Sequence, residues 1–276
     1  QMASSKQAGS SRICSLGRRQ DVYSPASSTH VLNLLPLLWL QRCSDLNDVA
    51  GGVSCSDQVM ASLDIKDAFL EVPQHTPLSI KLAGQTWVVL KNLPGQRLGA
   101  RAWYWYLRTF LDETMKFEFC SVQPCLARTS QCAILIHVDD IMYVGSLKFW
   151  NEFKEKLQQR FSISCSVLEG VGSEISFLKR RLLRVEDGLA LLPGSIGKLI
   201  KVWEEKFGKL RSSTTPADSS IQMEDNSPCL VGSDVTFFRM AVGTCLYITR
   251  DRPDVAFTVK ELSSYMSSPT ISAMRH

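Results

Sequence analysis

Three aspartates in this sequence could together hold divalent metal ions. Asp139 and Asp140 are adjacent, between the apolar runs "CAILIHV" and "IMYVG", and Asp64 follows the apolar-leaning run Val59–Leu63. Mg²⁺ is commonly held by one or two carboxylates together with substrate phosphates. Two such ions can stabilise the attacking and leaving oxygens of a phosphoryl or nucleotidyl transfer. The pattern therefore predicts catalytic and metal-binding roles for Asp64, Asp139 and Asp140.

A simpler interpretation stands beside this one. An isolated Asp-Asp pair in a hairpin is more often ordinary turn chemistry, because aspartate tolerates turn dihedrals. Asp64 alone is equally compatible with a helix cap or a turn. Only the combination of the two acidic segments with the sequence between them favours a shared site.

The elements around these aspartates can be predicted from the apolar pattern. Both runs beside Asp139 and Asp140 are too short for helices and rich in Ile and Val, so we expect two buried strands joined by a tight Asp139-Asp140 turn. Apolar segments from residue 21 to 165 alternate between short runs and helical spacing. This alternation predicts an α+β subdomain built on a sheet.

A helix is predicted between the two acidic segments, from Gly99 onward. One side of it carries Trp103, Leu107, Phe110 and Leu111. The other side is basic with one aromatic, and it could contact a phosphate backbone or a nucleotide triphosphate, although a solvated helix face is the usual explanation. Its members are Arg97, Arg101, Tyr104 and Arg108.

Composition and charge limit the class of protein. The chain has 276 residues, 45% of them apolar, with a net charge of +4, which indicates a folded protein. Residues 179 to 211 carry nine Lys and Arg against four Asp and Glu, so a surface that faces a polyanion is a reasonable expectation there. A solvated helix face would explain these charges equally well.

The cysteines and the apolar runs indicate in which cellular compartment the protein is expected. The nine cysteines form no CxxC motif, and the four histidines have no metal-binding spacing, which argues against a zinc site. The odd cysteine count without a secretory signal favours an intracellular, reducing compartment, cytoplasmic or nuclear, and not secretion. The run "VLNLLPLLWL" at 31 to 40 is shorter than the roughly 20 residues of a membrane span, so we expect a core helix.

The rest of the chain shows weaker landmarks. Residues 1–20 are rich in Ser, Gly and Gln and are expected to be disordered. Asp187-Gly188 predicts a hairpin within 177–193, and the spacing from Ile196 to Phe207 predicts a helix with lysines on its other side. Residues 212–234 are a polar linker, and 235–249 and 253–267 are expected to be helices.

Several ordered motifs resemble one known family. "SLDIKDAFLEVP", "LPGQRLGARAWY" and "ILIHVDDIMYVG" resemble the reverse transcriptase motifs of copia-class LTR retrotransposons, with His137 in place of the usual tyrosine. The similarity continues in "FLKRRLLRVEDGLALLPGSIGKLI", "STTP" and "VGTCLYITRDRPDVAFTVKELSSYMSSP" and covers roughly residues 21 to 270.

The resemblance implies an RNA-directed DNA polymerase domain of a Pol polyprotein with a right-hand architecture. It places truncated fingers and the palm at 21–165, a thumb-like region at 166–211, a linker at 212–234, and connecting helices at 235–276. Asp64 and Asp139 would bind both Mg²⁺ ions, or Mn²⁺, and Asp140 would be the third carboxylate. The implied partners are an RNA or DNA template with its primer and deoxynucleoside triphosphates.

The resemblance also assigns substrate residues. Phe69 matches the steric gate against ribonucleotides, and the simpler alternative is an ordinary core aromatic. The remaining substrate-binding candidates are Lys66, Asp67, Gln96 and Arg97, and the nucleic-acid-binding candidates are Arg101, Arg108, Lys198 and Lys201.

Two other functions stay open. The shortened N-terminal region fits a catalytically inactive retroelement-derived fragment that at most binds nucleic acid. A nuclease with two metal ions would need the same carboxylates, but it would not call for Phe69 or the "LPGQR" segment.

Overall fold

The computed structural model describes residues 24–25, 31–47, 57–192, 196–210, 213–217, 226–249 and 251–275. The segment 1–20 that the sequence predicts to be disordered lies outside these ranges, as does part of the predicted linker. The chain divides into two compact units, residues 1–178 with 182–190 and residues 179–181 with 191–276. Each unit is described by itself.

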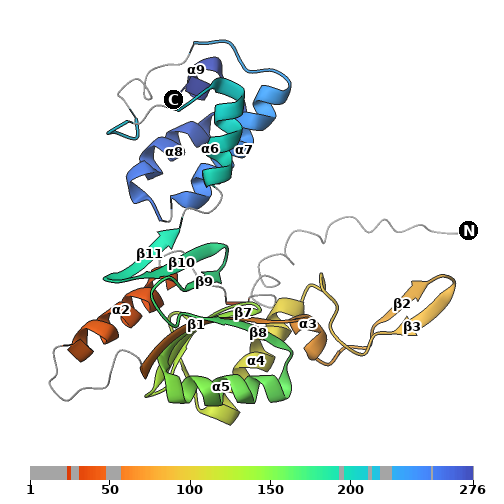
Figure 1. The fold of residues 1–276 in the computed structure, drawn as a ribbon. Coiled ribbons are helices and arrows are strands. Elements are labelled where there is room, and N and C mark those ends of the chain that lie inside the picture. The colour runs from red at the N-terminus through yellow and green to blue at the C-terminus, as the bar shows by residue number, and fades with distance from the viewer. Residues whose placement is uncertain are drawn as a thin grey trace, which may run out of the picture. The chain divides into compact units, whose positions relative to one another are not determined.

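An antiparallel sheet of six strands forms the centre of the first unit (Figure 1). Its strand order is β4-β5-β6-β7-β1-β8, so β1 lies between β7 and β8 although both are distant in sequence. Both faces of the central strands are buried, which explains why their sequences are continuous apolar runs. The strands are β1 (Gln58–Ile65), β4 (Glu118–Phe119), β5 (Leu126–Arg128), β6 (Cys132–His137), β7 (Asp140–Ser146) and β8 (Ile163–Val167).

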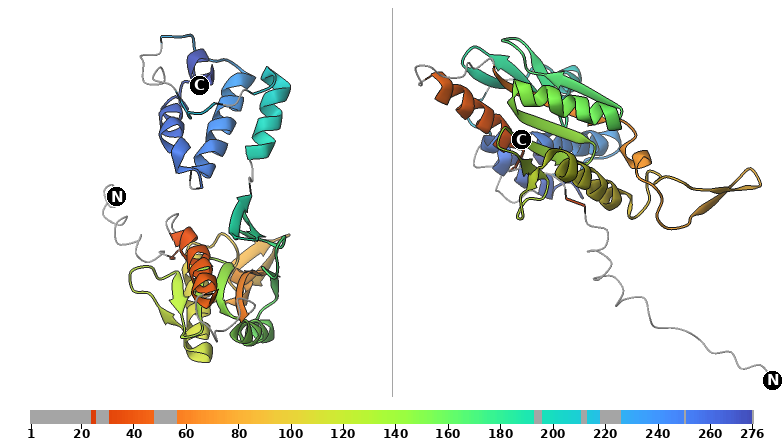
Figure 2. Two further views of the ribbon diagram at one scale, coloured as in Figure 1. Left: turned by 60° about the vertical axis from the view of Figure 1, so that its left-hand side comes forward. Right: turned by 90° about the horizontal axis from the view of Figure 1, so that it is seen from below.

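Two long helices cover one face of this sheet. Helices α4 (Gly99–Met115) and α5 (Leu147–Arg160) lie across it, as the view from below shows (Figure 2). Trp103 and Phe153 are the largest side chains that these helices bury completely. Helix α5 begins at an N-cap, Ser146, whose hydroxyl accepts from the amide of Phe149. The helix predicted from Gly99 onward is confirmed.

The opposite face is covered by the predicted core helix and a small sheet. Helix α2 (Leu34–Asn47) follows the 3₁₀ turn Val31–Asn33, and its Leu35 and Trp39 pack with Met60 and Met142 of the large sheet. The three-stranded sheet consists of β9 (Glu174–Phe177), β10 (Arg180–Val185) and β11 (Gly188–Leu192), in the order β11-β10-β9. The hairpin predicted at Asp187-Gly188 is thereby confirmed.

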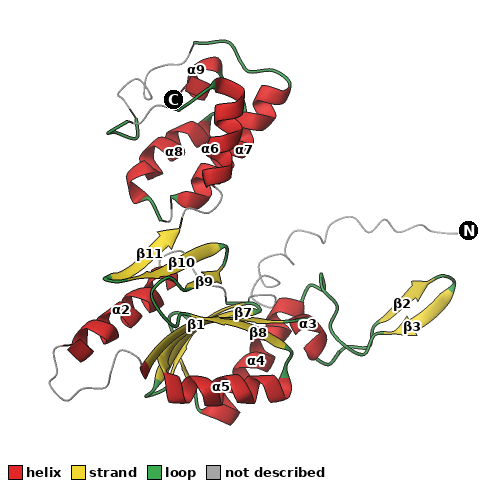
Figure 3. Cartoon of the chain, in the orientation of Figure 1, coloured by secondary structure: helices red, strands yellow, loops and turns green. Residues whose placement is uncertain are grey.

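Two further hairpins of the first unit have loops of two residues. The loop between β6 and β7 consists of Val138 and Asp139, and Asp140 is the first residue of β7. The predicted Asp139-Asp140 turn is therefore wrong by one residue, because the ladder pairs His137 with Asp140. The other hairpin, β2 (Ser79–Leu82) with β3 (Gln85–Val88), follows the short helix α3 (Ala68–Glu71) and extends away from the large sheet (Figure 3).

The second unit is helical. It contains α6 (Ile196–Phe207), α7 (Ser233–Ile248), the 3₁₀ turn Pro253–Val255, α8 (Ala256–Ser264) and α9 (Ile271–Arg275). The helix predicted from Ile196 is confirmed, and the predicted helix 253–267 is shorter and starts as a 3₁₀ turn.

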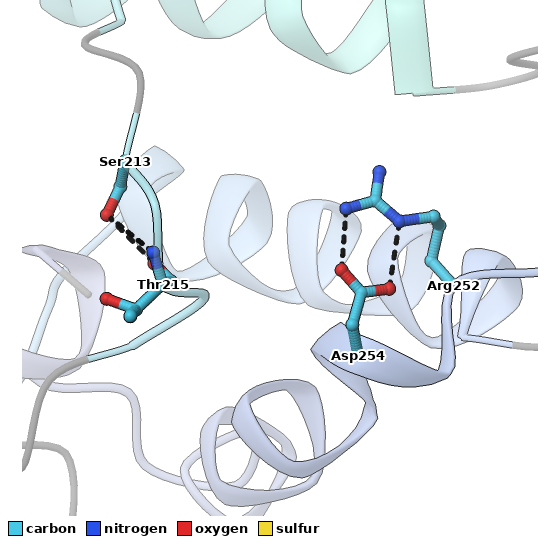
Figure 4. Close-up of polar contacts among 4 residues, drawn as sticks. All are labelled: Ser213, Thr215, Arg252 and Asp254. Atoms are coloured by element: carbon cyan, nitrogen blue, oxygen red, sulfur yellow. Dashed lines mark hydrogen bonds and ion pairs between the residues drawn. The ribbon is translucent and has the colours of Figure 1, made fainter.

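Side chains from three of these helices form the core of the second unit. Leu199, Phe237 and Ala241 pack as one cluster, and Phe238, Val242 and Ala273 as another. The motifs "RPD" and "STTP" each make a local contact (Figure 4). The Arg252 guanidinium binds both carboxylate oxygens of Asp254, and the Ser213 hydroxyl donates to the Thr215 carbonyl.

No helix in the described ranges combines the length and apolar character that crossing a membrane requires. The run at 31 to 40 forms the 3₁₀ turn and the first half of α2. Its side chains Val31, Leu32, Leu35 and Trp39 are buried in the core, which confirms the predicted core helix.

Candidate active site

The sheet register places two of the three candidate carboxylates opposite each other. Asp64 at the end of β1 pairs with Asp140 at the start of β7 in the antiparallel ladder. Side chains of directly paired residues stand on the same face of a sheet with their Cβ atoms roughly 5 Å apart. The structure therefore brings together Asp64 and Asp140, which are far apart in the sequence, and both are half-buried.

The same row of the sheet contains two more polar residues. His137 of β6 pairs with Asp140, and Ser164 of β8 pairs with Asp64. Four neighbouring strands thus present His137, Asp140, Asp64 and Ser164 in one line on one face. Further along the same face, Met60 and Met142 are fully buried. The polar row therefore lies where this apolar face ends.

Asp139, the third aspartate, lies in the loop between β6 and β7. A backbone hydrogen bond joins it to the strand that carries Asp64. The carbonyl oxygen of Asp139 accepts a hydrogen bond of 3.0 Å from the amide of Ile65. Ile65 follows Asp64 directly and is buried in the core beneath the sheet. The backbone of the loop is thus attached one residue away from the opposing carboxylate.

Electrostatics at this cluster raise the pKa of Asp140 from 3.8 to about 6. Burial is the largest cause, and repulsion by the carboxylates of Asp139 and Asp64 adds to it. A protonated Asp140 relieves this repulsion, and a cation bound among the three groups would relieve it as well.

The donor chemistry of the cluster fits a hard divalent cation, because all three side chains offer carboxylate oxygens. In the described part of the chain, no three His, Cys, Asp or Glu side chains are already arranged to hold a metal ion. The backbone thus places the donors in one neighbourhood, while the side chains do not form a closed coordination shell.

The candidate substrate residues Phe69 and Gln96 lie beside the start of α4. A Cβ atom added to Gly99 would lie 3.5 Å from Cδ1 of Phe69 and 3.7 Å from Cβ of Gln96. The Nε2 atom of Gln96 is buried without a hydrogen-bond partner, a costly arrangement for an amide group. Phe69 is partly buried and packs against the core of the first unit.

The other loop candidates are exposed. Lys66 and Asp67 form the turn between β1 and α3, and Asp67 has the left-handed φ of 52°. The carbonyl of Asp67 accepts from the amide of Leu70, which starts the short helix. Arg97 lies before α4 and is also exposed. Their side chains are accessible from solvent and lie within three residues of Asp64 or Gln96 in the sequence.

The predicted basic side of α4 is partly wrong in detail. Tyr104 is buried, and its hydroxyl donates to the carbonyl of Pro124 at 2.9 Å. Arg108 donates to Tyr104 Oη and stacks on the rings of Trp105 and Phe119, at 5.1 and 4.5 Å from their centres. The predicted basic side of α4 therefore includes a tyrosine that faces the interior. The helical spacing of the residues did not reveal its burial, because both sides of α4 carry aromatic residues.

The candidate lysines belong to the second unit. Lys198 and Lys201 are exposed on α6, whereas Arg101 and Arg108 belong to α4 of the first unit. The candidate nucleic-acid-binding residues are therefore divided between the two units.

Sequence reasoning missed the partners that the tertiary structure adds to the site. Ser164 gave no signal, and Trp103 was predicted only as a member of one side of the helix, because their roles at the site depend on a strand pairing and on a helix-to-loop hydrogen bond. His137 drew attention only as a substitution in a motif, and its position opposite Asp140 required the register.

Comparisons with known proteins find only weak structural similarity. No protein-family model and no curated protein matches this sequence. A structure of the foamy viral protease-reverse transcriptase in complex with RNA/DNA hybrid is similar over 70% of this chain and 24% of its own, at 14% identity and a TM-score of 0.33. A structure of apo telomerase from Candida tropicalis, truncated from the C-terminal domain, is similar over 64% and 42%, at 11% identity and a TM-score of 0.37.

This chain therefore spans less than half the length of either structure. Both neighbours are reverse-transcriptase-like polymerases. At these low TM-scores the likeness by itself assigns no activity to this chain.

Proposed function

We propose that this chain is the RNA-directed DNA polymerase domain of a copia-type retrotransposon. The observation that carries the proposal is the pairing of Asp64 with Asp140 beside the Asp139 loop. Strands β1 and β7, together with the loop before β7, bring together three carboxylates from distant parts of the sequence, and these would hold the two metal ions of a nucleotidyl transfer site.

Each carboxylate has a role in this proposal. Asp64 and Asp139 would hold the Mg²⁺ or Mn²⁺ ions, and Asp140 would add negative charge beside them. The bound ions would supply electrostatic stabilisation of the attacking and leaving oxygens. The primer 3′-hydroxyl loses its proton and attacks the α-phosphorus of a deoxynucleoside triphosphate, and the bond to pyrophosphate breaks as the new phosphodiester forms.

The substrate residues extend the same site. Phe69 would stand where a ribose 2′-hydroxyl would approach, and the Gln96 amide would gain from the nucleotide the partner that it lacks. Lys66, Asp67 and Arg97 would line the triphosphate pocket. Arg101, Arg108, Lys198 and Lys201 would contact the backbones of template and primer, a salt-sensitive interaction.

Primer extension tests the proposal directly. The purified chain should extend oligo(dT) on poly(rA) with Mg²⁺ and deoxythymidine triphosphate, and Asp139→Asn should abolish extension because it removes one anionic ligand. Asp187→Asn is a matched control, because Asp187 is an exposed aspartate in the loop of another hairpin. Folded protein that extends no primer would contradict the enzymatic proposal, as would full activity of Asp139→Asn.

An inactive derivative that at most binds nucleic acid is the second candidate. The observation in its favour is that the described acidic side chains form no ready metal-binding group. It predicts binding of a labelled template-primer duplex that weakens with salt and does not depend on Asp139. Binding without extension, unchanged in Asp139→Asn, would select this alternative.

A further inference from the structure

The loop that carries Asp139 has an unusual backbone. Val138, the first of its two residues, has a φ of 58°, in the left-handed region. A β-branched residue is a rare occupant of this region because its branched side chain crowds the backbone. Glycine usually takes this position in two-residue hairpin loops. The loop is thus strained, and such a conformation persists only where surrounding contacts enforce it.

Two hydrogen bonds hold the loop, one for each of its carbonyl groups. The indole Nε1 of Trp103 in α4 donates to the carbonyl of Val138 at 2.7 Å. The amide of Ile65 donates to the carbonyl of Asp139 at 3.0 Å. The side chain of Val138 also packs against the core beneath the sheet. The loop is therefore attached to α4 on one side and to the strand of Asp64 on the other.

Trp103 is itself held firmly. Its side chain is fully buried, and its ring meets Phe161 edge-on at 5.6 Å between ring centres. A buried indole on a packed helix has little freedom, so its N–H is a fixed donor. The same helix begins at Gly99, beside Phe69 and Gln96. Helix α4 thus contacts both the candidate nucleotide residues and the carboxylate loop.

We propose that Trp103 is a positioning residue that fixes the strained Val138-Asp139 loop through its indole N–H, and so places the Asp139 carboxylate for ion binding. It would act through the loop backbone without touching substrate. This inference rests on the proposed function only where primer extension is the measurement. The geometry of the loop and its affinity for a metal ion can be measured without any catalysis.

The test compares Trp103→Phe with Trp150→Phe. Both replace a buried tryptophan of the same core, and Trp150 packs on Tyr143 of β7 at 5.0 Å between ring centres. Hydrogen exchange of peptides spanning 136–142 should quicken roughly tenfold in Trp103→Phe alone, as the loss of one hydrogen bond predicts. Equal exchange in the two variants would overturn the proposal.

Metal affinity gives the second readout. Mn²⁺ binding, followed by calorimetry, should weaken roughly 10- to 100-fold in Trp103→Phe, the usual effect of losing a group that orients a ligand. Trp150→Phe should bind Mn²⁺ as the unmodified chain does. In primer extension, Trp103→Phe should lower kcat and leave the KM for deoxynucleotide unchanged. If the unmodified chain extends no primer, the proposed function fails while the exchange comparison still decides this inference.

A double-mutant cycle tests the link to backbone strain. Val138→Gly removes the conflict at positive φ, so Trp103→Phe should change loop exchange less in the Val138→Gly background than in the unmodified one. Equal effects in both backgrounds would contradict this link.

A measurement on the unmodified protein covers the case in which Trp103→Phe does not fold. In nuclear magnetic resonance spectra, added Mg²⁺ should move the indole N–H signal of Trp103 and leave that of Trp150 in place. An unmoved Trp103 signal while Mg²⁺ binds would refute the proposal.

Discussion

Two hairpins of the first unit share one local design and have opposite surroundings. Strands β6 and β7 are joined by the two residues Val138-Asp139, and strands β2 and β3 by the two residues Ala83-Gly84. The side chains of β7 are mostly buried, whereas every residue of β2 and β3 is exposed. The buried hairpin carries the candidate carboxylates, and the exposed one carries Ile80 opposite Trp87.

The difference shows what each hairpin depends on. Gly84 adopts its positive φ at no steric cost, and Ala83, which also has positive φ, lacks a branched Cβ, so the exposed hairpin is specified mainly by its turn and its cross-strand pairs. Val138 at positive φ goes against local preference. The buried hairpin therefore depends on tertiary packing, which is suited to holding charged groups in fixed positions.

Two aromatic side chains should show the largest contrast, one of α5 that packs on the buried hairpin and one that belongs to the exposed hairpin. Phe153 is fully buried and stacks on Tyr143 at 5.5 Å between ring centres, so Phe153→Ala should lower the free energy of unfolding by about 3–5 kcal/mol. Trp87 is 54% exposed, and Trp87→Ala should cost at most about 1 kcal/mol. Hydrogen exchange of β7 and of β3 measures the two effects. Similar losses would contradict the distinction between the hairpins.

Adding one methyl group to a glycine gives the next comparison. A Cβ on Gly145 of β7 would meet the Cys132 side chain and lie 2.6 Å from the Gln131 carbonyl oxygen, so Gly145→Ala should cost about 3 kcal/mol. A Cβ on Gly84 would have open space, and Gly84→Ala should cost only about 1–2 kcal/mol through its φ of 78°. Urea denaturation would measure both, and an equal or reversed order would be inconsistent with these clashes.

The last prediction concerns the pH dependence of stability, through Asp140 of the buried hairpin. The folded chain keeps a proton on Asp140 up to a pKa of about 6, above the ordinary 3.8, so between these values the folded state binds more protons than the unfolded state. Stability should therefore decrease as the pH rises from about 4 to about 6, and the loss persists above that range. Asp140→Asn should remove this part of the pH dependence in urea denaturation measured at several pH values. A variant with the same pH profile as the unmodified chain would show that Asp140 is not the group responsible.

Much of the local structure could be predicted from the sequence, for a definite reason. Short Ile- and Val-rich runs favour strands and helical spacing favours α4 and α6, because these patterns depend on neighbouring residues. The loop of the site could not be located to the residue, since glycine-like backbone at Val138 is enforced from outside the hairpin. The burial of Tyr104 could not be predicted from the sequence either, because aromatic residues occur around the whole of α4.

By itself, the sequence determined that three aspartates lie at the ends of apolar runs and that a helix lies between the two acidic segments. Only the tertiary structure decided that Asp64 pairs with Asp140, that His137 and Ser164 extend this row, and that Trp103 holds the Asp139 loop. The reason is physical. Strands buried on both faces carry no alternating pattern that reveals their register, so the register is set by packing against α2, α4 and α5.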